Sequence, residues 1–516
     1  SWKYATTEVS LDEPGTKRIQ RGWRPDDDDY YGVPLKQSTQ AITRVAPQQV
    51  WQSLTDESDF YRVDFETPEL TYLKNEYRMK FSFGISRDKF KRNFDESNFE
   101  ITDASRNRFQ YGLDRNFFVP GSWSDFVTPG PQEFPSSGAD IHNYFETTDS
   151  VLKYVPKIFR DYSGNTQTKA YYVNTQFDLP KDIKISIGVR SEKFSAQAIP
   201  GIDKGMEITK YQAQIRNKTA VIDDDRFYPS LAVVKELGDE FKLSINYGKT
   251  TARPNLREIA HVESNDPISN NVFKGNPLLI PSEIDNFDAR IDWNLADEDI
   301  ISMSTFFKKI DNPIQGLIAN DALNMDIRKI NDQVSFPIGG ETFVNSKIAE
   351  LYGFELEGKF GLVSLLDELN GFRIGGNLTW SSSEVSLSNA EKESIQYNKE
   401  ERMERALEGQ SEWIYTVDVS YANEDWGTLS TLVYSFYDSR LHAAFPAGPD
   451  DLWEDAYSTF DFIHSHKFGT EQDWKLKFSA KNLTAEDRIV RVRGYDAIEE
   501  KYQTSRSYGL SLEKNF

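Results

Sequence analysis

Apolar and polar residues alternate along many short segments of this chain, with the period of a β-strand. In one such segment, one face carries Phe287, Ala289, Ile291 and Trp293, and the other carries Asp288, Arg290 and Asp292. Successive side chains of a strand point to opposite sides, so this segment would have one apolar and one charged face. A charged face is costly in a protein core, whereas a water-filled lumen accepts it. The pattern predicts a strand in the wall of a barrel with lipid outside.

About sixteen such segments follow one another, joined alternately by short polar turns and long irregular stretches. The last one, Ser507–Phe516, carries Tyr508, Leu510 and Leu512 on one face and ends on an aromatic residue. If Phe516 lies at the periplasmic end, every short turn falls on the periplasmic side and every long stretch on the outer side. This asymmetry is typical of bacterial outer-membrane barrels. We expect long extracellular loops over about residues 11–57, 93–168, 196–225, 251–283, 318–345 and 388–410.

The predicted fold class is therefore all-β, an antiparallel transmembrane β-barrel of outer-membrane type over residues 1–516, with no plug domain. No run of eighteen apolar residues predicts a membrane-spanning helix. The chain has no cysteine, which excludes disulfides and thiolate metal sites. Its 82 acidic and 60 basic residues give a net charge of -22, which argues against a nucleic-acid partner. No signal peptide stands at Ser1, so an exported protein has lost it or begins upstream.

Several stretches carry a resemblance to a known family. They are INYGKTTARPNLREIA (residues 245–260), GNPLLIPSEIDNFDARIDW (275–293), FFKKIDNPIQG (306–316), YGFELEGKF (352–360), FSAKNLTAEDR (478–488) and the terminal SYGLSLEKNF. In this order they resemble the barrel of TonB-dependent outer-membrane receptors. The resemblance implies an integral protein of the bacterial outer membrane that takes up a scarce ligand, a siderophore-iron complex or an oligosaccharide, without chemistry on it and without a cofactor. It also implies outer-membrane lipid and a TonB-type energy-transducing complex as partners.

The chain departs from that family in one respect. Such receptors have a plug domain inside a barrel of about 22 strands, whereas only about sixteen strands and no plug are visible here. We expect Ser1 to be an internal residue, with the plug and first strands on an upstream part or on a separate chain. A passive porin, or a barrel subunit of a larger outer-membrane complex with a partner lipoprotein or other subunits, remains the alternative.

Candidate ligand-binding residues lie where strands meet the expected outer loops. Arg253 and Arg257 could anchor a loop or hold an anionic ligand. Tyr437, Arg440 and His442 could line a ligand vestibule. Tryptophans of the expected outer loops, Trp23, Trp123 and Trp453, could stack on a sugar or an aromatic chelator, or pack within the loops.

No metal site is expected. The runs Asp26–Asp29 and Asp223–Asp225 lack the spacing of a calcium loop, and solvated surface explains them better. His464 and His466 share a strand face without a third ligand, which favours simple lumen polarity. The five histidines offer no convincing partner for a nucleophile, so the sequence does not predict an enzyme.

Overall fold

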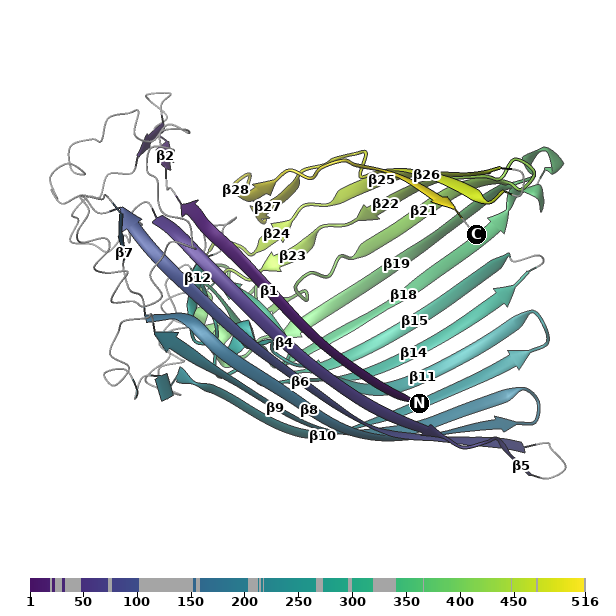
Figure 1. The fold of residues 1–516 in the computed structure, drawn as a ribbon, viewed down its shortest axis with the longest axis horizontal. Coiled ribbons are helices and arrows are strands. Elements are labelled where there is room, and N and C mark those ends of the chain that lie inside the picture. Colours follow the sequence, from purple (N-terminus) through teal and green to yellow (C-terminus); the bar gives the residue numbers. More distant parts are fainter. Residues whose placement is uncertain are drawn as a thin grey trace.

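The computed structural model describes residues 1–18, 21–23, 30–32, 48–72, 77–101, 152–154, 158–202, 212, 215–216, 218–265, 272–295, 299–318, 340–364, 366–446, 448–469 and 472–514. Its main element is an antiparallel sheet of 19 strands, curved around one axis (Figure 1). Three of these strands, β5 (Leu70–Tyr72), β7 (Leu152–Tyr154) and β20 (Glu404–Arg405), have only two or three residues. The other sixteen form the wall, as the alternation predicts.

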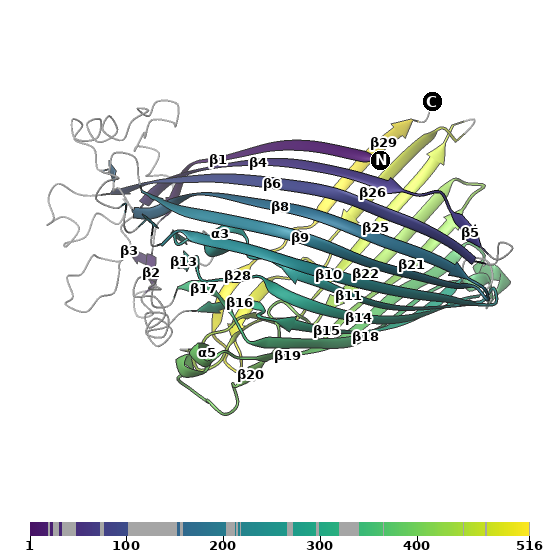
Figure 2. The same cartoon turned by 90° about the horizontal axis from the view of Figure 1, so that it is seen from below.

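The wall strands pair with their neighbours in chain order. They are β1 (Trp2–Arg18), β4 (Gln48–Glu66), β6 (Tyr77–Ile101), β8 (Ile158–Leu179), β9 (Ile183–Ile202), β10 (Ala220–Leu237), β11 (Phe241–Ala252), β14 (Ser282–Asn294), β15 (Ile300–Asp311), β18 (Ile348–Gly361), β19 (Phe372–Ser386), β21 (Trp413–Asn423), β22 (Thr428–Tyr437), β25 (Tyr457–Phe468), β26 (Trp474–Lys481) and β29 (Ser507–Lys514). Short turns join them at one end of the wall, the turn end. Longer segments join them at the other, the loop end (Figure 2).

The two faces of the wall differ as the alternation predicts. Phe287 and Ile291 on β14 are 47% and 41% exposed, and the paired strands add exposed apolar residues to the same face. On the opposite face, Arg290 binds Asp292 and Glu357 of β18. An apolar outer face suits lipid, and a hydrogen-bonded polar inner face suits a watery lumen.

Strands continue into three of the segments expected to be loops. β1 and β4 stay paired from Trp2↔Val63 up to Arg18↔Gln48, and similar extensions lengthen β6, β8, β9 and β10. Strand pairing therefore covers parts of these expected loops, and Asp223–Asp225 belong to β10. Ion pairs such as Arg92–Asp56 and Lys91–Glu57 cross these extensions. Polar residues replace the apolar face there, so the alternation fades although the strand continues.

Smaller elements gather at the loop end. They comprise the sheet of β12 (Glu263–Asn265), β13 (Val272–Lys274), β17 (Glu341–Asn345) and β16 (Ile314–Ile318), the sheet of β23 (Arg440–Ala443), β24 (Leu452–Glu454), β27 (Arg488–Val492) and β28 (Ile498–Tyr502), the pair β2 (Arg21–Trp23) and β3 (Tyr30–Gly32), and helices α3 (Leu256–Ile259) and α5 (Asn389–Ser394). At the turn end, the 3-10 turns η4 (Leu362–Ser364) and η5 (Asp367–Leu369) join β18 to β19. No helix in the described part is long and apolar enough to cross a membrane.

Buried apolar clusters lie at the loop end. The largest joins Leu256, Ile259 and Leu279 to Ala196 of β9 and Ile222 of β10. Ala196 and Ile222 are register partners, and they alternate along their strands with the exposed Val221 and Val189. Residues 253–265 and 272–281 therefore fold onto the inner face of the wall.

The two borders of the wall are β1 and β29, which are both labelled in Figure 2. Within the described residues, β1 pairs only with β4, and β29 pairs only with β26. Tyr508, Leu510 and Leu512 of β29 are 65%, 74% and 58% exposed. Each border keeps one edge of backbone hydrogen-bonding groups unpaired within the described residues.

Candidate ligand-binding site

Residues 253–265 and 272–281 form an ordered part of the lumen lining. Helix α3 starts at a capping box, in which Asn255 accepts from the Glu258 amide while the Glu258 carboxylate accepts from the Asn255 amide. Gly275 lies against the helix end, where a Cβ atom would meet the Ala260 carbonyl oxygen at 1.9 Å. Glycine is therefore required for this close approach.

The two arginines predicted from this segment serve its packing. Arg253 donates to Glu192 of β9 at 2.5 Å, and its guanidinium lies 4.4 Å from the centre of the Phe194 ring. Arg257 lies 4.5 Å from the centre of the Phe273 ring and donates to Ser264. These contacts favour the loop-anchoring interpretation of both residues.

His261 is a buried histidine in the same segment. It is 0% exposed, and neither ring nitrogen has a hydrogen-bond partner among the described residues. Burial, together with the nearby cations of Lys274 and Lys218, lowers the pKa of His261 to about 3. The Lys274 ammonium in turn binds Glu263 at 2.9 Å. His261 is therefore neutral in the docked segment.

A cavity of about 270 Å³ lies between the two small sheets of the loop end. Its walls come from β13, β16 and β17 of one sheet, from β23 and β24 of the other, and from residues 408–409. The sheets meet through a bridge between Leu317 and Ala444. Arg440 and His442, two residues predicted from the sequence, both line this cavity. The structure thus brings one predicted pair together at a concave site.

Three of the polar residues that line the cavity are glutamates, and the others are Thr342, Arg440 and His442. Arg440 donates to Glu454 at 2.6 Å, and Arg488 binds the other oxygen of the same carboxylate. Glu408 keeps water access and accepts from the Gly316 amide. Surrounding protein raises the pKa of Glu408, and the charge of Glu341 adds to the effect. The cavity lining therefore combines carboxylates with the cationic Arg440 and with His442.

The other predicted residues lie apart from this cavity lining. Tyr437 stacks on Tyr457, with 4.8 Å between ring centres. Trp453 belongs to β24, and the Arg493 guanidinium covers its ring at 4.5 Å. Trp123 and the run 26–29 lie outside the described residues, and only the backbone of Trp23 is described.

Sequence reasoning missed Glu408, Glu341 and Thr342. They lie in or beside the expected loops 388–410 and 318–345, where no periodicity distinguishes one polar residue from another. A hint existed in Gly316, because a glycine within a strand often marks the close approach of another group. Here that group is the Glu408 carboxylate, which a Gly316 Cβ atom would meet at 2.7 Å.

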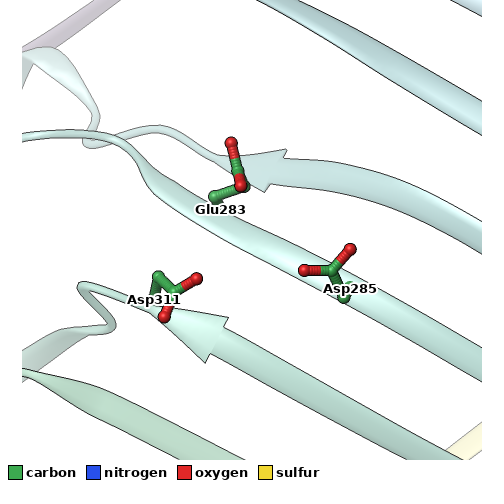
Figure 3. Close-up of side chains that lie close together, drawn as sticks. All are labelled: Glu283, Asp285 and Asp311. Atoms are coloured by element: carbon green, nitrogen blue, oxygen red, sulfur yellow. The ribbon is translucent and has the colours of Figure 1, made fainter.

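One carboxylate cluster has the spacing of a metal site. Glu283 and Asp285 of β14 and Asp311 of β15 place oxygens within 4.8 Å of one another (Figure 3). Lys249 lies 2.6 Å from Glu283 and 3.7 Å from Asp285, and Lys309 lies 3.5 Å from Asp311. The Arg226 guanidinium lies 3.5 Å from Glu283 as well, so three cations already balance the three carboxylates and the cluster offers no reason to assign a metal ion.

The expected lumen position of His464 and His466 was wrong. Strand register aligns His466 with Leu476, which is 36% exposed on the outer face of the wall. His464 and His466 form Nδ1 hydrogen bonds with Ser430 and Thr428 of β22, at 2.9 and 3.0 Å. Hydroxyl partners on the neighbouring strand satisfy one polar atom of each imidazole, which lets this pair interrupt the apolar face.

A family model described as TonB-dependent receptor-like, β-barrel, matches residues 2–483. The chain belongs to this TonB-dependent receptor family. It is thereby an integral barrel protein of the bacterial outer membrane, and its all-β wall agrees with that assignment. No curated protein matches the chain in sequence.

Solved structures share the fold of this TonB-dependent receptor chain. The siderophore receptor PiuA from Acinetobacter baumannii matches with a TM-score of 0.55 and 12% identity, over 99% of this chain and 62% of that one. The ferric-catecholate import receptor Fiu from E. coli matches with a TM-score of 0.54 and 12% identity, over 100% and 61%. The ferric citrate transporter FecA gives 0.54 and 12%, over 100% and 62%. The chain thus spans about three fifths of these proteins.

Proposed function

We propose that this chain forms the wall and part of the ligand vestibule of an outer-membrane transporter, which takes up a scarce ligand with energy delivered by a TonB-type complex. The observation that carries the proposal is the cavity at the loop end of a wall that belongs to the TonB-dependent receptor family. A siderophore-iron complex or an oligosaccharide is the proposed ligand. The similar structures include a ferric citrate transporter and a siderophore receptor, which supports the first class.

The proposed division of labour follows from the geometry. The wall strands pair along their length and provide a rigid frame. The two small sheets, together with residues 253–265 and 272–281, lie at the loop end and hold the polar groups that a ligand would meet. The chain therefore contributes capture and passage, whereas the energised movement belongs to a plug that we place on a partner or an upstream segment. Outer-membrane lipid surrounds the wall, and a lipoprotein or another outer-membrane subunit is a further proposed partner.

Uptake and conductance measurements test this function against the porin alternative. The protein that carries this chain is expressed in cells with and without TonB, and accumulation of ferric siderophores and oligosaccharides is measured. We expect accumulation that needs TonB, together with a closed pore in planar bilayers. Equal uptake in both strains with a steadily open pore would instead identify a porin. A constant partner after mild solubilisation, with no uptake, would identify a structural subunit.

A further inference from the structure

Three cationic side chains lie directly opposite one another on the outer face of the wall. Strand register aligns Arg87 of β6 with Lys169 of β8, and Lys169 in turn with Lys193 of β9. All three side chains are exposed. Arg87 and Lys169 share a face with the exposed Ile85 and Tyr171, because residues two apart on a strand point to the same side. We call Arg87, Lys169 and Lys193 the cationic row.

The cationic row has no carboxylate partner within the described residues. Arg87 donates a hydrogen bond to the amide oxygen of Gln167 at 3.0 Å, and neither Lys169 nor Lys193 forms an ion pair there. Asp225 of β10 is the register partner of Lys193, yet no ion pair joins them. Like charges directly opposite on neighbouring strands destabilise a sheet. An anion bound across the row would therefore remove a cost as well as add an interaction.

Two lysines of the same face, also near the loop end, contrast with the row because each has its own carboxylate. Lys91 on β6 binds Glu57 at 3.0 Å, and Lys249 on β11 binds Glu283 at 2.6 Å. Those pairs need no further anion. The cationic row instead keeps an excess of positive charge, although the whole chain carries a net charge of -22.

The cationic row lies at the border of the apolar band towards the loop end. In the next layer towards the turn end, register aligns Ile85 with Tyr171, and the exposed Phe227 lies on the same face. One layer further follow the exposed residues Phe83, Val173 and Val189. The loop end faces the outside in barrels of this type. The row therefore lies at the level where lipids of the outer leaflet change from acyl chains to head groups.

We infer that the cationic row binds the phosphate groups of a lipid in the outer leaflet, whose acyl chains lie on the apolar band. Neighbouring strands lie about 4.8 Å apart, so the row extends across about 10 Å, within which three long side chains reach one phosphate or hold two. The arginine fork matches phosphate oxygens, and the lysines add point charges. Free phosphate would leave the apolar band unused, whereas a lipid contacts both parts of the surface.

This inference goes beyond the proposed function, because it needs only the outer-membrane location that the family assignment gives. It places a specific lipid contact on the outside of the wall, apart from the ligand vestibule at the inner face. Lipid binding requires neither TonB nor a transported ligand. Failure of the proposed transport would therefore leave the lipid result intact, and the reverse also holds.

Native mass spectrometry of the purified full protein in a neutral detergent tests the inference. The probes are dioleoyl phosphatidate and dioleoylglycerol, which share their acyl chains and differ in the phosphate group. Both are titrated against the unchanged protein and against a row variant that combines Arg87→Gln, Lys169→Gln and Lys193→Gln. Inorganic phosphate at millimolar concentration is added to a parallel series as a competitor for the lipid.

Two further variants separate recognition by the row from charge number and from folding. The control variant combines Lys467→Gln, Lys475→Gln and Lys477→Gln, which removes the same number of charges from the inner face of β25 and β26. The conservative variant exchanges lysine and arginine within the row, as Arg87→Lys, Lys169→Arg and Lys193→Arg, and keeps it positive. Heat-modifiable electrophoresis verifies that each variant is folded before the titration.

We expect phosphatidate to bind the unchanged protein about tenfold or more tightly than dioleoylglycerol. The row variant should lose about 100-fold in affinity for phosphatidate, at about fivefold for each cation removed, whereas the control and conservative variants should keep it. Equal binding of the two lipids, equal weakening by the row and control variants, or displacement of the lipid by inorganic phosphate would overturn the inference. Loss of a copurifying protein from the row variant, with lipid binding unchanged, would overturn it as well.

Discussion

Acidification should release residues 253–265 and 272–281 from the wall, and His261 is the group responsible. The folded-state pKa of His261 is about 3, below its ordinary value of 6.5, so the docked segment accepts only the neutral ring. The contribution of His261 to docking is therefore complete above pH 6.5 and decreases as the pH falls from 6.5 towards 3. His261→Leu removes this titration, and no described hydrogen-bond partner is left unpaired by the change.

The size of the effect follows from the two pKa values. If undocking exposes His261 to water, the ratio of undocked to docked protein should rise about 25-fold between pH 7 and pH 5. This corresponds to about 2 kcal/mol of lost docking free energy. Glu258 and Glu263 also titrate in this segment. Burial raises the pKa of Glu258, and the Lys274 charge lowers the pKa of Glu263. Both glutamates remain in the His261→Leu variant. The difference in pH dependence between the two proteins therefore gives the contribution of His261 alone.

A single cysteine can report this opening, because the natural chain contains none. Val262→Cys places a thiol beside His261 at a position that is 2% exposed. Its labelling rate, divided by that of an exposed Glu424→Cys reference, measures the open fraction at each pH. We expect the ratio to rise about 25-fold from pH 7 to pH 5 with His261, and only weakly with His261→Leu. The same pH response in both proteins would refute the assignment to His261.

Three further changes test the wall and its lining. Met303→Arg on the apolar face should cost about 2–4 kcal/mol and lower the folded fraction seen by heat-modifiable electrophoresis, whereas Ser304→Arg on the lumen face should be tolerated. Gly275→Ala should cost about 1–3 kcal/mol of docking free energy and raise the labelling rate of the buried cysteine. Gly248→Ala has open space at its Cβ position and should leave that rate unchanged. Glu391→Gln leaves the buried Arg405 without its carboxylate, which should cost about 3–5 kcal/mol of local stability. Amide hydrogen exchange near α5 should accelerate accordingly.

The wall was predictable because its signal is local. A strand that separates lipid from water must alternate, so pairs such as 287–293 and 301–307 could be identified without any knowledge of their neighbours. The same reasoning could not locate the strand ends. At Glu57 and Lys91 polar side chains replace the apolar face and only the backbone ladder continues.

The cavity was not predictable, since it depends on contacts between distant segments. Gly316, Glu408 and His442 meet only because two small sheets pair at the loop end. Nothing in the local pattern distinguishes Glu408 from other acidic residues of its loop. Arg440 and His442 were found for a different reason: they directly follow the recognisable wall strand β22.

The unpaired borders of the wall impose a counting rule on any closed barrel that contains it. Backbone amides and carbonyls cannot remain unpaired in lipid, so β1 and β29 must each gain a neighbour in the membrane. Sixteen strands that alternate in direction begin and end with opposite senses, so β1 and β29 are already antiparallel. Direct pairing of the two borders preserves this alternation, and so does inserting any even number of strands. One additional strand, or any other odd number, would force a parallel pair into the barrel.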